Sequence, residues 1–121
     1  MAKEKHTNSA LTIEVDDREV LNVCWRGQST GRDPGRFILP ILTSVLERST
    51  LTGQAIVLDF RELEYMNSST ITPIIRILER ARRGSNHVEV VYLKDQSWQM
   101  LSFTALEVFN TEDGRIQIQG M

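Results

Sequence analysis

Residues 54–72 read QAIVLDFRELEYMNSSTIT, and this stretch is the most informative about the class of fold. Its first part, residues 54–60, is a short and nearly unbroken apolar run after Gly53, which is typical of a central strand covered on both faces. A polar bend over residues 61–69 follows. Apolar residues then recur at helical spacing from Ile71 onward, so a buried strand leads directly into a helix. That succession is typical of an α/β fold.

Two amphipathic helices are predicted on either side of this strand. Before it, apolar residues recur at helical spacing around Pro40, and proline is best tolerated in a first turn, so this helix begins at residue 36 or 37. After it, Pro73 places the next helix start within residues 68–72. Four of these five residues are Ser or Thr, which can cap the free N–H groups of a helix. Gly84 is placed to end the second helix.

The opening of the chain predicts a flexible segment and a hairpin. Residues 1–10 are polar, and a terminus with little to bury is commonly mobile. Residues 11–15 and 20–25 alternate between apolar and polar side chains around a turn at residues 16–18, which is typical of a β-hairpin. Residues 26–35 hold three Gly and one Pro and predict a loop.

The C-terminal part predicts a strand, a short helix and a second hairpin. The strand spans residues 87–93, and the helix spans residues 97–105, with Trp98, Leu101 and Ala105 expected to face inward. Two alternating runs, residues 106–109 and 115–119, flank a turn at residues 112–114 and predict the hairpin.

These elements predict one α/β domain over residues 11–121. Their order is β-β-α-β-α-β-α-β, and helices between strands imply parallel neighbours joined by right-handed crossovers. Together with the opening hairpin, this order predicts a mixed sheet of four to six strands with helices packed against it.

The composition argues against several classes of partner. The 121 residues carry 14 Lys and Arg against 16 Asp and Glu, and a net charge of −2 does not fit a nucleic-acid binder. There is no apolar run of the roughly 18 residues that a membrane span needs, so we expect no membrane partner. The single cysteine, Cys24, is expected to be a small buried hydrophobe, and its isolation suits a cytoplasmic protein.

The residues that enzymes use are also scarce. Nucleophilic catalysis usually needs a histidine base, and the chain has only His6 and His87. His and Cys show no ligand spacing, and no Gly-rich loop with a following Lys-Ser or Lys-Thr is present. We therefore expect a noncatalytic protein without a metal or cofactor.

The hydroxyls after the central strand form the candidate site. A helix start offers free N–H groups and the positive end of the helix dipole, so a phosphate on Ser68 or Ser69 could be held there. Such a phosphate would add a charge of about −1.5 to −2 and could expel an acidic or apolar partner surface. The alternative is that Ser68 or Ser69 only caps the helix.

The same residues resemble a known family. Asp59-Phe60, Leu63 and then Tyr65-Met66-Asn67-Ser68-Ser69 resemble the signature of the STAS domain of bacterial anti-sigma factor antagonists. In that family the order is strand, hydrophobic-Met-Asp-Ser-Ser-Gly and helix, and the resemblance in element order covers most of this chain.

The resemblance implies a regulatory adapter in the bacterial cytoplasm. The first serine of the pair, here Ser68, would be phosphorylated by a serine kinase that doubles as an anti-sigma factor or switch protein. A phosphatase of the PP2C type would remove the phosphate. The unphosphorylated form would bind the partner and the phosphorylated form would release it.

Departures from the family keep alternatives open. Asn67 stands where the family has Asp, and Thr70 stands where it has Gly. Ser69, Thr70 and Thr72 are alternative phosphate acceptors. The departures favour another pathway, such as one with a diguanylate cyclase or biofilm effector. A constitutive STAS-type scaffold and, with less support, a nucleotide or small-anion binder are the other candidates.

The expected partner-binding residues extend from the bend onto the second helix. They include two arginines on the polar side of this helix. The hypothesis is that this side contacts an acidic partner surface. The alternative is a solvated face with an ion pair between Glu79 and Arg83. The expected contacts are Asn67, Ser68, Ser69, Thr70, Arg76 and Arg80.

Overall fold

The antiparallel half of the sheet follows the alternation in the sequence. In the computed structural model, which describes residues 3–121, strands β2 (Leu11–Asp16) and β3 (Leu21–Ser29) form the predicted hairpin. Every second residue of β2 is buried, because one face of the strand packs on the core. Strand β3 runs four residues beyond the predicted end, into the expected loop.

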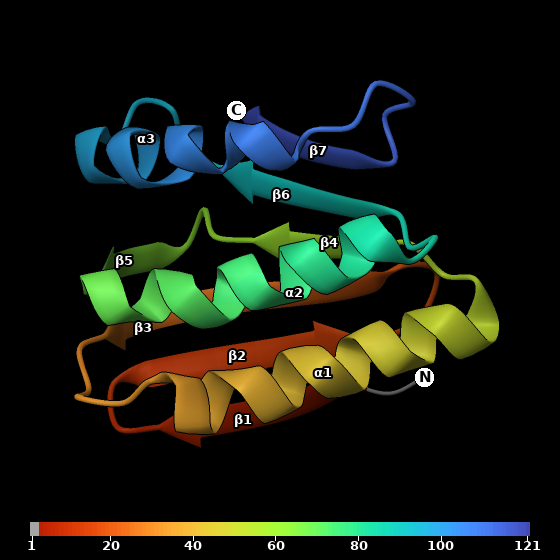
Figure 1. The fold of residues 1–121 in the computed structure, drawn as a ribbon. Helices are drawn as coiled ribbons and strands as arrows, with labels where there is room; N and C mark the ends of the chain where they lie inside the picture. The colour runs from red at the N-terminus through yellow and green to blue at the C-terminus, as the bar shows by residue number, and fades with distance from the viewer. Residues whose placement is uncertain (1–2) are drawn as a thin grey trace.

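The expectation of a flexible start is wrong for β1 (Lys3–Asn8), which pairs with β2 as an antiparallel edge strand (Figure 1). Its side chains are exposed or half-buried, so hydrophobic patterning carries no signal for it. Backbone pairing holds β1 in place, together with an ion pair of 2.6 Å between Glu4 and Arg48. The rest of the predicted flexible segment includes residues 1–2, which lie outside the described residues.

The parallel half of the sheet contains the predicted central strand. Strand β4 (Ile56–Asp59) lies between β3 and β6 (Val88–Tyr92), and β7 (Ile116–Gly120) pairs in parallel with β6. The strand order is β1-β2-β3-β4-β6-β7. A further short strand, β5 (Leu63–Met66), pairs with the carboxyl end of β3 beyond β4. The described residues thus form a mixed sheet of seven strands, not four to six.

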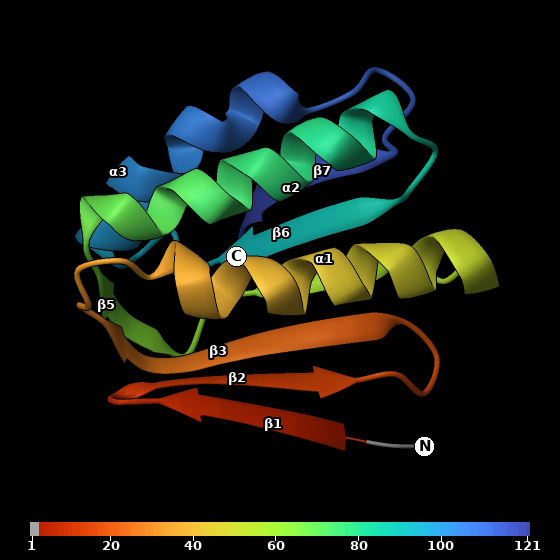
Figure 2. The same ribbon diagram turned by 60° about the horizontal axis from the view of Figure 1, so that its bottom comes forward.

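The helices all lie on one face of the sheet (Figures 1 and 2). They are α1 (Gly35–Thr52), α2 (Ile71–Arg83) and α3 (Ser97–Thr104). Helix α1 begins one residue before the predicted start, and α2 ends at the predicted Gly84. Within the described residues, no helix combines the length and the apolar character that crossing a membrane requires.

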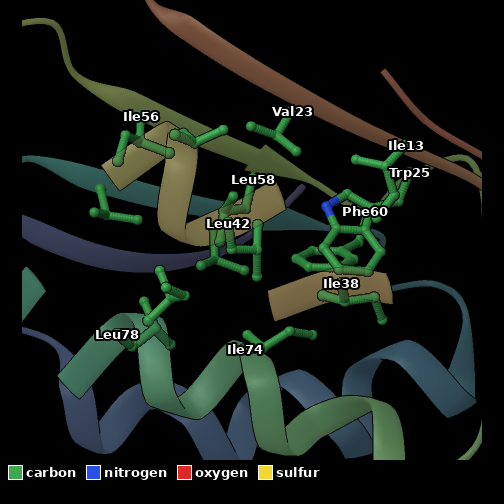
Figure 3. Close-up of a cluster of buried hydrophobic side chains, with 14 of the residues drawn as sticks. Ile13, Val23, Trp25, Ile38, Leu42, Ile56, Leu58, Phe60, Ile74 and Leu78 are labelled. Atoms are coloured by element: carbon green, nitrogen blue, oxygen red, sulfur yellow. The ribbon is translucent and has the colours of Figure 1, made fainter. Parts of the chain in front are cut away.

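The core fills the space between this face of the sheet and the helices. Figure 3 shows Trp25 and Phe60 pointing from the sheet toward Ile38 of α1, with Ile74 of α2 nearby. The ring centroids of Trp25 and Phe60 are 4.6 Å apart, and Phe60 lies at the same distance from Phe103. These large side chains are fully buried, and their burial is the main source of stability in a domain of this size.

Within residues 3–121 no helix covers the opposite face of the sheet, so the prediction that the central strand is covered on both faces is wrong. Cys24 and Val91 are buried there but lie outside the main core cluster. Cys24, Asp59 and Val91 are side by side on neighbouring strands. Val57, the apolar residue of β4 on this open face, is only half-buried, whereas Ile56 and Leu58 on the other face are buried.

The prediction of a C-terminal hairpin is also wrong. Residues Ala105–Phe109 form a 3₁₀ helix, η2, in which Leu106 and Phe109 face the core. Strand β7 then pairs in parallel with β6, and parallel neighbours need a crossover, which α3 and η2 supply. The predicted turn before β7 is present, with Gly114 at φ 75°.

Helix α3 buries a different face from the predicted one. Gln99 and Phe103 are fully buried, Trp98 is half-buried, and Leu101 is 72% exposed. The Gln99 side-chain amide donates to the carbonyls of Phe60 (2.8 Å) and Leu63 (3.0 Å). Its oxygen accepts from the N–H of Leu93 at 2.8 Å. Gln99 therefore anchors the chain that leads from β4 to the candidate site.

Candidate functional site

The candidate site lies where β3 and β5 end side by side. Because these strands are parallel, the segments that follow them leave the same edge of the sheet. The backbone N–H of Asn67 donates to the carbonyl of Ser29 at 2.9 Å, and its side-chain amide donates to the carbonyl of Gly31 at 2.8 Å. Asn67 thus ties the start of η1 (Ser68–Thr70) to the loop before α1.

Asn67 is also the residue that caps the helix. Its side-chain oxygen accepts from the backbone N–H of Thr70 at 3.2 Å and from the Thr70 hydroxyl at 2.9 Å. The N-cap position of α2 is Thr70, within the predicted residues 68–72, but its side chain makes no capping bond to α2. The side chain that caps is that of Asn67 at the start of η1, one residue before the predicted range. An aspartate here could accept the same two bonds but has no N–H to donate to Gly31. The departure from the STAS signature therefore has a structural role in this chain.

Thr70 does not fit its predicted role as a phosphate acceptor or partner contact. Its side chain is fully buried, and its hydroxyl lies 2.7 Å from the hydroxyl of Ser29. A kinase or partner could reach Thr70 only after the start of the helix had opened. The Thr70 hydroxyl instead joins β3 to η1.

Ser68 and Ser69 are the accessible hydroxyls beside this cap. Both residues are exposed, and within residues 3–121 neither hydroxyl makes a hydrogen bond. Their backbone N–H groups also lack an acceptor there, as expected for the first residues of a helix. Thr72, the remaining predicted acceptor, is exposed in the first turn of α2. The capping-only interpretation of Ser68 and Ser69 does not fit this geometry, because Asn67 provides the cap.

A groove opens beside these residues, between α1 from its first turn to Glu47 and the first part of α2 as far as Arg76. Its volume is about 860 Å³. We call it the arginine groove, because three arginines from two separate segments line it. Ser69 lines it and Ser68 does not. The lining residues used below are Arg32, Arg36, Leu39, Thr72, Pro73 and Arg76.

The structure separates the two predicted arginines. Arg76 lines the arginine groove, whereas Arg80, one turn later on the exposed side of α2, does not. Neither side chain forms an ion pair or a hydrogen bond within the described residues, and the alternative pair between Glu79 and Arg83 is not formed there either. Arg76 is therefore available to a ligand in the groove, whereas Arg80 lies outside it.

Arg32 and Arg36 were missed by the sequence analysis. They belong to the predicted loop and the predicted helix start, and nothing in their local pattern places them near Ser69. The sequence analysis did not predict β5, and this strand is what brings Arg32 and Arg36 to the site. Once residues 63–66 are paired in parallel with β3, the segments after both strands must meet at one edge of the sheet.

Cys24 lies within β3, and His87 directly precedes β6. No three His, Cys, Asp or Glu side chains lie close enough there to hold a metal ion. Burial raises the pKa of the Cys24 thiol to about 11, which leaves little reactive thiolate near neutral pH. His87 is exposed at the start of β6, as expected for a solvated histidine.

Comparison with known proteins assigns no family to the chain. A scan against protein-family models finds no match, and a search of the curated proteins also finds none. The resemblance to the STAS signature remains a prediction from the residues of the bend and the order of the elements.

Proposed function

We propose that this chain is a noncatalytic regulatory adapter of the STAS type, which binds a partner protein and is switched by phosphorylation of Ser68. The observation that carries the proposal is the exposed and unbonded hydroxyl of Ser68 beside a helix start whose cap is supplied by Asn67. Because the serine has no structural bond to lose, its modification does not require the fold to open.

The helix start gives the phosphate a local electrostatic role. The free N–H groups of Ser68 and Ser69 and the positive end of the α2 dipole favour an anion at this position. A phosphate would bring a charge of about −1.5 to −2 to a surface that also carries Arg32 and Arg76. An acidic partner that used this surface would be repelled, so the unphosphorylated form is the binding form.

The partners in this proposal follow from the STAS resemblance. They are a serine kinase that doubles as an anti-sigma factor or switch protein, and a PP2C-type phosphatase that restores the binding form. The departure at Asn67 makes a diguanylate cyclase or another effector an alternative target of the switch. The proposal places the adapter in the bacterial cytoplasm.

The test uses tagged full-length chain purified from its native cells. We expect mass spectrometry to find phosphate on Ser68 and to identify a kinase or phosphatase in the eluate. The variant Ser68→Ala should lose the phosphate and keep the partner, and Ser68→Asp should bind that partner about tenfold more weakly. Ser97→Ala is the matched control, because Ser97 is also an exposed and unbonded serine at a helix start but lies outside the arginine groove, and it should keep both the phosphate and the partner.

Two results would contradict the switch. Equal partner binding by Ser68→Ala and Ser68→Asp would remove Ser68 as the control point. Unmodified protein in a single stoichiometric complex under several growth conditions would instead identify a constitutive scaffold. Thermal stabilisation of the pure chain by a nucleotide, without a protein partner, would favour the small-anion binder.

A further inference from the structure

The arginine groove has the size of a binding site and brings together segments far apart in sequence. Its volume of about 860 Å³ lies in the range of sites that enclose a ligand or a few peptide residues. The loop before α1 contributes Arg32, the first turn of α1 contributes Arg36, and α2 contributes Arg76. The groove therefore depends on the tertiary fold and is not a property of one helix.

The charge of the groove favours an acidic occupant. Arg32, Arg36 and Arg76 are exposed, and within residues 3–121 their side chains form no ion pair or hydrogen bond. Two carboxylates also line the groove, those of Asp33 and Glu47, so the side chains leave an excess of positive charge. The first turns of α1 and α2 add the positive ends of two helix dipoles.

The apolar part of the groove favours a peptide over a simple anion. Most of the accessible lining is apolar, and Leu39 and Pro40 contribute to it above the buried Pro73. Leu39 is half-buried against the core and Pro40 is exposed, so an incoming side chain could cover further apolar surface. A free phosphate would use the arginines and leave this surface in water, whereas a peptide with acidic and apolar side chains would use both.

We infer that the arginine groove binds an acidic peptide segment with apolar side chains, supplied by a partner protein. This inference deepens the proposed function and rests on its premise that the chain acts by binding a protein. It also gives the switch a physical cause. Ser69 lines the groove next to Ser68, so a phosphate on Ser68 and the carboxylates of the segment would compete for the same arginines.

The experiment uses the unphosphorylated full chain labelled with ¹⁵N, and a synthetic peptide of alternating Glu and Leu as the probe. A peptide in which Lys replaces Glu controls for charge. Binding is followed through amide chemical shifts. The groove variant R32Q/R36Q/R76Q is compared with R80Q/R82Q/R83Q, which removes the same charge from exposed arginines outside the groove. If the groove triple does not fold, Arg76→Gln and Arg80→Gln replace the two triples.

We expect saturable shifts at the start of α1 and in the first turn of α2 with the Glu peptide only. The groove variant should bind about tenfold more weakly or worse, and the control variant should change by less than about twofold. Equal weakening in both variants would overturn the inference, since attraction would then reflect net charge alone. Shifts outside the groove, an absence of saturable shifts, or saturation by inorganic phosphate without binding of the peptide would also overturn it.

The outcome is separable from that of the proposed function. Ser68 is intact and unphosphorylated in every sample, so failure of peptide binding would leave the Ser68 switch standing at another surface. Conversely, loss of the Ser68 effect in cells would leave an acidic-peptide groove that is not controlled by phosphate.

Discussion

Arginines on the two faces of the molecule are held in different ways. On the open face of the sheet, Arg26 bonds to Glu62 at 2.9 Å and to Glu14 at 3.2 Å, and Arg61 bonds to Asp59. In the arginine groove, the side chains of Arg32, Arg36 and Arg76 have no such partner in the described residues. The first group links strands and turns of the sheet. The second group is not used by the fold and is available to a ligand.

The pKa of Asp59 reflects its hydrogen bonds with Arg61 on the open face of the sheet. Burial raises the pKa of this carboxyl, but the side-chain and backbone hydrogen bonds from Arg61 outweigh burial and leave the pKa below its usual value. Such a shift is a measure of how firmly the fold holds the charge. Asp59 is thus held in its charged form by Arg61, whereas Arg32, Arg36 and Arg76 of the groove have no bonded carboxylate in the described residues.

The largest expected effect on stability comes from Asn67, which joins the loop before α1 to the start of η1 beside the groove. Asn67→Ala should lower the free energy of unfolding by about 1–2 kcal/mol, because it removes the helix cap and the bond to Gly31 before Arg32. Ser68→Ala, which removes an unbonded exposed hydroxyl, should change it by less than about 0.5 kcal/mol. Urea unfolding measures both. Equal losses would mean that Ser68 also supports the helix start.

A smaller effect is expected from the arginines themselves. Arg26→Gln should lower the free energy of unfolding by about 0.2–1 kcal/mol, because two ion pairs at a partly exposed site are lost. The loss should shrink as salt is added. Arg76→Gln should leave stability unchanged within error. A comparable loss at Arg76 would show that the groove arginines serve the fold, and the contrast between the two faces would fail.

The smallest effect is expected in the acid range. Because the pKa of Asp59 is lower in the folded protein than in the unfolded chain, its contribution to stability is complete above the unfolded value, which is about 3.9 for Asp. The contribution is lost as the pH falls through the lowered folded pKa. Asp59→Asn should therefore flatten the decline of stability below about pH 4. Parallel acid-unfolding profiles for the two proteins would contradict this assignment.

Elements with a strong pattern of their own were predictable. The β2–β3 hairpin, α1, β4, α2 and β6 all appear close to their predicted positions, because their apolar spacing matches a strand or helix period over enough residues. Helix α3 was located correctly but has only eight residues, so its buried face could not be read from periodicity. Gln99 faces inward there because three backbone groups are available to bond with it.

Some features of the candidate site were also predictable from local patterns, and others were not. Local patterns in residues 11–93 were enough to predict the α/β class, the starts of the main helices and the cluster of hydroxyls at residues 68–72. Which hydroxyls are exposed, the cap from Asn67, and the place of Arg32 and Arg36 in one groove with Ser69 depend on contacts between distant segments. Strand β5 forms through pairing with β3, which is distant in sequence, and the groove exists only where that pairing brings the two following segments to one edge of the sheet. Strand β1 escaped prediction for another reason, since its side chains are exposed or half-buried and only backbone pairing with the neighbouring β2 marks it as a strand.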